Sequence, residues 1–184
     1  TIAYGDNHLD PLTNLVASPT AVPDVSEYSM PYVIALLEKN LQLSRARAVL
    51  AAILGQQDTT PGSTTRGLFR DHPRPGSAYS RRSLYFVAPL LARALRKHGE
   101  KLGPELSGRV KEALELGVKA LARPEPNARD DEELLRQAAL AQSAAALGDT
   151  ALIARSTAAV SHWLRAVESA GRTWTPSPSG DTLR

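Results

Sequence analysis

Apolar residues recur every three or four positions along most of this 184-residue chain, and glycine or proline interrupts the pattern at intervals. In residues 84–95 the apolar positions include Leu84, Val87, Leu91 and Leu95, which share one face of an α-helix. We find no alternating apolar pattern long enough to require a β-sheet. The chain is therefore predicted to be all-α.

The helical segments group into about three helical hairpins. The predicted helix pairs are residues 26–37 with 44–54, 80–98 with 101–124, and 130–149 with 150–171. Candidate N-caps are Ser26, Ser44, and Ser80 or Ser83, and Gly99 is a natural C-terminal stop. The second and third hairpins align as a weak repeat of about 45 residues, which predicts hairpins stacked in an arc.

The length is sufficient for one domain with its own core. We predict an irregular N-terminal arm over residues 1–25, a helical-hairpin domain over residues 26–184, and an irregular tail within it at residues 171–184. The chain begins at Thr1 and not at Met, which indicates a processed product or a fragment. A cleaved export signal would explain this start, so a secreted or periplasmic location is favoured over a cytoplasmic one.

Composition excludes several classes of function. The chain contains no cysteine, so a disulfide framework and a cysteine nucleophile are both ruled out. Its net charge of +3 comes from arginines scattered among acids, which does not predict nucleic-acid binding. There is no apolar run of about 18 residues to span a membrane. Histidine pairs with metal-ligand spacing do not occur, so we predict neither a metal site nor a cofactor.

The connector between the first two hairpins contains "GQQDTTPGSTTRGLFRDHPRP", residues 55–75, with many side chains suited to chemistry. Asp58 and Asp71 could form the carboxylate pair that glycoside hydrolysis requires. His72 is the best general acid or base, because the carboxylate of Asp71 could fix its tautomer. The alternative is that these residues only form turns and helix caps in a solvated loop.

The same connector and its neighbours hold candidate binding residues. Gln57 could hydrogen-bond to sugar hydroxyls, and ending a helix in a polar residue is its alternative role. A cationic cluster could hold a glycan or another polyanion through bidentate guanidinium contacts, and its residues are Arg66, Arg70, Arg81 and Arg82. Solvated surface arginines are the alternative. Trp174 could provide a stacking platform for a sugar or anchor the C-terminal tail.

From residue 50 to the C-terminus the chain resembles uncharacterised bacterial proteins similar to the α/α-toroid enzymes. These enzymes include six-hairpin glycosidases and heparinase-like and alginate-lyase-like polysaccharide lyases. The resemblance rests on the stretches "AAILGQQDTTPGSTTRGLFR", "LLARALRKHGEKLGPELSGRVKEAL", "AALGDTALIARSTAAVSHWLRAV" and "GRTWTPSPSGDTL". It implies a ring of hairpins with a glycan cleft formed by loops at one end. Among the tyrosine, amide and tryptophan side chains typical of such clefts, Tyr79, Asn127 and Trp174 could stand in.

A closed toroid needs more hairpins than this chain provides, so the resemblance implies a partial toroid completed by a missing half or by a second copy. The implied function is that of a polysaccharide lyase or glycoside hydrolase. A second hypothesis is a non-catalytic helical-repeat module that binds a partner or a polymer. A third is a small all-α terpene-type enzyme, prompted by "RDDEELL", although acidic residues also favour a helix N-terminus for electrostatic reasons.

Overall fold

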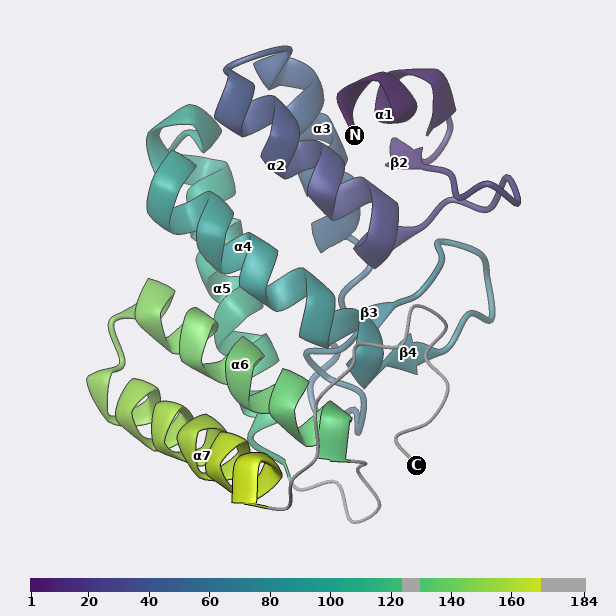
Figure 1. The fold of residues 1–184 in the computed structure, drawn as a ribbon. Helices are drawn as coiled ribbons and strands as arrows, with labels where there is room; N and C mark the ends of the chain where they lie inside the picture. The colour runs from purple at the N-terminus through teal and green to yellow at the C-terminus, as the bar shows by residue number, and fades with distance from the viewer. Residues whose placement is uncertain (124–129, 170–184) are drawn as a thin grey trace.

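The computed structural model describes residues 1–123 and 130–169, and helices make up most of this part of the chain (Figure 1). The α-helices are α1 (Ile2–His8), α2 (Met30–Lys39), α3 (Leu43–Leu54), α4 (Arg81–Leu102), α5 (Pro104–Leu121), α6 (Asp130–Leu147) and α7 (Thr150–Ser169). A π-helical segment, η1 (Val25–Ser29), leads into α2. Two antiparallel pairs of short strands are β1 (Leu9–Asp10) with β2 (Leu15–Val16), and β3 (Phe69–Arg70) with β4 (Tyr79–Ser80). The predicted all-α class is confirmed.

The predicted hairpins are present as α2 with α3, α4 with α5, and α6 with α7. The turn of the second hairpin differs from the prediction, because Gly99 lies inside α4. That helix continues past a non-helical residue, His98 (φ −136°), and the turn is made by Gly103, whose φ of 82° favours glycine. Pro104 then occupies the first turn of α5, where its missing N–H costs nothing. Gly148 makes the third turn, as predicted, with φ 77°.

Two predicted helix caps are wrong and one is confirmed. The cap before α2 is Asp24 and not Ser26, since the Asp24 carboxylate accepts hydrogen bonds from two backbone amides of η1. At α3 the N-cap position is occupied by Gln42 and not by Ser44. Ser80 caps α4, because its hydroxyl accepts a hydrogen bond from the amide of Ser83 at 3.3 Å.

Helix α4 is central to the packing and contacts α2, α5 and α6. Figure 1 shows α2, α4 and α6 side by side, with α3 and α5 behind them. α7 packs against α6 at the end of this arrangement. Leucine is the commonest core residue, and Leu36, Leu50, Leu84, Leu91 and Leu114 are all fully or almost fully buried. None of the described helices has the length and apolar character that crossing a membrane requires.

The N-terminal arm is more ordered than predicted. Residues 1–25 contain α1 and the β1–β2 pair, and the side chains of Leu15 and Val16 are fully buried. Gly5 lies so close to Tyr32 that a Cβ atom there would be 2.2 Å from the ring. The Tyr32 hydroxyl donates a hydrogen bond of 2.6 Å to Asp6. The segment therefore belongs to the folded body through contacts with the first hairpin. The predicted tail at residues 171–184 lies outside the described residues.

Candidate functional site

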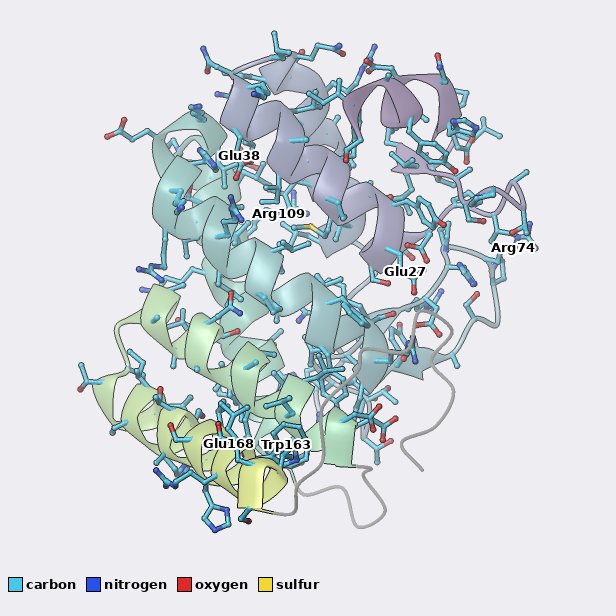
Figure 2. All side chains as sticks on the ribbon, in the orientation of Figure 1. Glu27, Glu38, Arg74, Arg109, Trp163 and Glu168 are labelled. Atoms are coloured by element: carbon cyan, nitrogen blue, oxygen red, sulfur yellow. The ribbon has the colours of Figure 1, made fainter. Side chains whose placement is uncertain are left out.

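A pocket of about 460 Å³ brings together three separate segments of the chain. We call it the acid pocket, because two aspartates and a glutamate line it. One wall is the continuous segment of residues 18–28, which includes the start of η1, the second is the connector after β3, and the third is the first turn of α4. The lining residues include Ser18, Thr20, Asp24, Glu27, Tyr28, Asp71, His72, Arg82 and Ser83. In Figure 2, Glu27 lies near the start of α2, and Arg74 lies at the tip of the loop between β3 and β4.

Asp24 is the most deeply buried acid of this pocket, with 8% of its surface exposed. Its Oδ1 accepts hydrogen bonds from the amides of Glu27 at 2.6 Å and Tyr28 at 3.2 Å, so it caps η1. Burial raises the pKa of the Asp24 carboxyl, although these two amides and the nearby His72 oppose the rise. The charge of Asp71 adds to it. Asp24 therefore holds its proton more readily than an exposed aspartate.

Asp71 and His72 line the pocket, but they do not interact as predicted. The Ser83 hydroxyl donates a hydrogen bond to Oδ1 of Asp71. The His72 Nδ1 lies 3.1 Å from the carbonyl oxygen of Pro23. Because a carbonyl oxygen can only accept, Nδ1 is the donor of this hydrogen bond, and in the tautomer that this contact selects Nε2 is the nitrogen that can accept. The tautomer of His72 is thus set by Pro23, whereas Asp71 was predicted to set it.

Asp58 does not line the acid pocket, so the predicted Asp58–Asp71 pair gains no support. It is 4% exposed, and its carboxylate organises its own loop. Its Oδ1 accepts from the Thr60 amide at 2.9 Å, while Oδ2 accepts from the hydroxyls of Ser63 at 2.6 Å and Thr65 at 2.7 Å. These hydrogen bonds, led by the one from Ser63, hold the pKa of Asp58 well below its usual range.

Gln57 has a structural role in place of the predicted sugar contact. The side chain is 7% exposed, and its amide nitrogen donates to the carbonyl oxygens of Gly67 at 3.0 Å and Ala113 at 2.9 Å. Gly67 itself packs so closely on α5 that a Cβ atom there would lie 2.3 Å from the carbonyl oxygen of Leu116. We call residues 56–70 the packed loop, since these contacts attach them to α5.

The predicted cationic cluster is divided among different environments. Arg82 lines the acid pocket and lies over the ring of Phe86, with its guanidinium carbon 5.9 Å from the ring centroid. Arg70 lies 4.9 Å over the ring of Tyr79, which is half-buried and does not line the pocket. Arg81 donates a hydrogen bond of 3.0 Å to the carbonyl oxygen of Arg123.

Arg66, the last member of the predicted cluster, is exposed, and its carbonyl oxygen accepts a hydrogen bond of 2.6 Å from Arg123. It does not line the acid pocket. Trp174 and Asn127 lie outside the described residues. Of the predicted site residues, the acid pocket therefore brings together Asp71, His72 and Arg82.

Sequence reasoning missed Asp24, Glu27 and Tyr28, because residues 1–25 were interpreted as an irregular arm and the following residues as helix. A signal was present, since an aspartate followed three residues later by a glutamate resembles a capping box. That signal identifies Asp24 as a cap, but its position beside the connector follows only from the tertiary structure. The ring of Tyr28 also contacts that of Tyr4, with ring centroids 5.6 Å apart.

Within residues 1–123 and 130–169, no group of three or more histidines and acids is arranged to hold a metal ion. Of the acidic stretch "RDDEELL", the described side chains of Asp131, Glu132 and Glu133 belong to α6 and do not line the acid pocket. Compared with protein families, curated proteins and solved structures, the chain matches none of them.

Proposed function

We propose that this chain is a carbohydrate-active protein that cleaves a glycosidic bond by acid–base chemistry in the acid pocket. The observation that carries the proposal is the buried Asp24 carboxyl, whose pKa is raised, in one pocket with Asp71 and His72. Hydrolysis and elimination both need one group that gives a proton and another that takes one. Groups of both kinds line this pocket.

In this proposal Asp24 gives its proton to the oxygen of the leaving sugar. Nε2 of His72 takes a proton, either from the attacking water or from the carbon next to an acidic group. Arg82 would hold a carboxylate of the substrate, since a guanidinium binds carboxylates through paired hydrogen bonds. Tyr28 offers a ring face for stacking against sugar C–H groups.

The arrangement of helices supports placing the protein among toroid-type folds. α2, α4 and α6 lie side by side, and each pairs with the helix that follows it in the chain. The acid pocket lies at the N-terminal ends of η1 and α4, as expected of a cleft formed by loops at one end of hairpins. We propose that the chain forms part of a toroid, completed by a missing half or by a second copy.

The test is to incubate the purified chain with a panel of neutral and acidic glycans. Elimination produces unsaturated ends that absorb in the ultraviolet, while hydrolysis produces reducing ends without that absorbance. We expect one of the two products from the wild-type chain and a much lower yield of it from Asp24→Asn. The variant is a fair control because asparagine caps a helix as well as aspartate does.

A non-catalytic binding module is the second candidate, because the carboxylates of Asp24 and Asp71 both have structural roles in the fold. Asp24 caps η1, and Asp71 accepts a hydrogen bond from Ser83. For this candidate we expect calorimetry to detect glycan binding without either product. Absence of binding and of cleavage across the panel would contradict both candidates.

A further inference from the structure

A second pocket lies between α4 and α6 and has a volume of about 220 Å³. We call it the basic pocket. Its lining residues are Ala92, Arg93, Arg96, Lys97 and Gln142. Three of these side chains are cations, and Gln142 adds a side-chain amide from the neighbouring helix. The basic pocket shares no lining residue with the acid pocket.

The spacing of the three cations places them together. Arg93, Arg96 and Lys97 stand at positions i, i+3 and i+4 of α4, which face the same way on a helix. Arg93 forms an ion pair with Glu38, which Figure 2 shows near the C-terminal end of α2. Within the described part of the chain, no carboxylate pairs with Arg96 or Lys97. The pocket therefore has more positive charge than its neighbours neutralise.

The imidazole of His98, which follows Lys97 in the chain, lies within reach of these positive charges. Both of its ring nitrogens are buried without a hydrogen-bond partner among the described residues. Burial lowers the pKa of His98, and the charges of Lys101, Arg93 and Lys97 lower it further, while Glu38 alone raises it. A bound anion would offset part of the positive charge and raise the pKa of His98, so binding in the basic pocket should be detectable at this imidazole.

We propose that the basic pocket binds a doubly charged tetrahedral oxyanion, either as a free ion or as a phosphate or sulfate ester on a larger molecule. The guanidinium groups of Arg93 and Arg96 can each donate paired hydrogen bonds to such an anion, and Lys97 adds a point charge. The Gln142 amide supplies a neutral donor from α6. This site does not depend on the proposed glycan chemistry of the acid pocket.

The proposal is tested by titrating the full chain with inorganic phosphate, inorganic sulfate and glucose 6-phosphate, with sodium chloride at matched ionic strength as the control. Binding is followed by calorimetry and by the imidazole NMR signals. We expect the divalent anions to shift the His98 signals and raise the pKa of His98. The exposed His162 on α7 should not respond. Tighter binding of glucose 6-phosphate than of phosphate would identify an ester as the ligand, and equal affinities would identify the free ion.

Variants separate the pocket from general surface charge. The double change Arg96→Gln with Lys97→Gln should weaken phosphate binding at least tenfold, whereas Arg109→Gln, an exposed cation of α5 outside the pocket, should leave it unchanged. These side chains are exposed, so circular dichroism should show an intact fold. If the double variant nevertheless unfolds, Gln142→Ala provides the same test, with a smaller expected loss of phosphate affinity. Equal losses in the pocket and control variants, or an equal response to chloride, would overturn the proposal.

Discussion

Asp24 and Asp58 are both buried carboxylates, with 8% and 4% of their surfaces exposed, yet the pKa of Asp24 is raised and that of Asp58 is lowered. At Asp58, Oδ1 accepts a hydrogen bond from a backbone amide and Oδ2 accepts hydrogen bonds from two hydroxyls. Both hydrogen bonds to the Asp24 carboxylate, from the amides of Glu27 and Tyr28, reach Oδ1, and the charge of Asp71 opposes its ionisation. Burial is the largest influence on the pKa of Asp24, whereas at Asp58 the hydrogen bonds from Ser63 and Thr65 outweigh burial.

The difference separates two regions with different tasks. In the packed loop both oxygens of the Asp58 carboxylate accept hydrogen bonds from the loop itself. The loop is fixed to α5 through Gln57 and Gly67. In the acid pocket only Oδ1 of the Asp24 carboxylate accepts hydrogen bonds among the described residues, and the residue lines the open volume. Four changes test this division, from the largest expected effect to the smallest.

Asp24→Asn should reduce glycan cleavage by about 10³-fold, because the variant has no acidic proton to give. Its stability should be preserved or improved at neutral pH. The reason is that the folded state raises the pKa of Asp24, so the ionised carboxylate destabilises the protein as the pH rises through that value. Product assays and urea denaturation measure the two effects. If cleavage fell only in proportion to the folded fraction of the variant, the role of Asp24 would be structural.

Gly67→Ala should destabilise the protein by about 3 kcal/mol, since its φ is 92° and a Cβ atom would strike the backbone of α5. Gly76 is the matched control, because it also has a positive φ (82°) but a Cβ atom added there would meet no other atom within 4 Å. Gly76→Ala should cost about 1 kcal/mol. If urea denaturation gave the same loss for both variants, the packed loop would not be fixed to α5 as described.

Asp58→Asn should cost about 2 kcal/mol at neutral pH, because it replaces a charged acceptor of hydrogen bonds. Since the folded state lowers the pKa of Asp58, the unfolded chain takes up the proton first when the pH falls. The stabilisation is therefore present above the ordinary aspartate pKa of about 3.9 and is lost below it. Denaturation at a series of pH values should show the gap between wild type and variant narrowing in acid. A gap independent of pH would contradict this assignment.

Ser83→Ala should have the smallest effect, a loss of about 1 kcal/mol from the hydrogen bond to Asp71. If Asp71 acts in the acid pocket, the cleavage rate per folded molecule should also fall, since the carboxylate loses its fixed orientation. Thermal denaturation and product assays on the same preparation make the comparison. Unchanged cleavage would indicate that the position of Asp71 is unimportant for the reaction.

The hairpins could be predicted from the sequence because their apolar residues keep a helical period over many turns. Helix α1 could not, because it has seven residues and is held by tertiary contacts such as those of Tyr32 with Gly5 and Asp6. Asp71 and His72 were found as candidates from their chemistry. Gln57 and Asp58 had the same polar character in the same connector, and nothing in the local sequence marks them as buried. Their burial follows from the contact of Gly67 with α5, which joins distant parts of the chain.

The acid pocket also has a consequence for the order of folding. Its walls are joined by long-range hydrogen bonds, from the amide of Val25 to the carbonyl oxygen of Asp71 and between His72 and Pro23, which lie 49 positions apart. Such contacts form late, because the chain between them must first be ordered. The first hairpin lies between the two walls, so its formation brings them together. A folding intermediate with native helices but without this closure would contain helix-to-helix core contacts but not the acid pocket, in which the glycan chemistry is proposed.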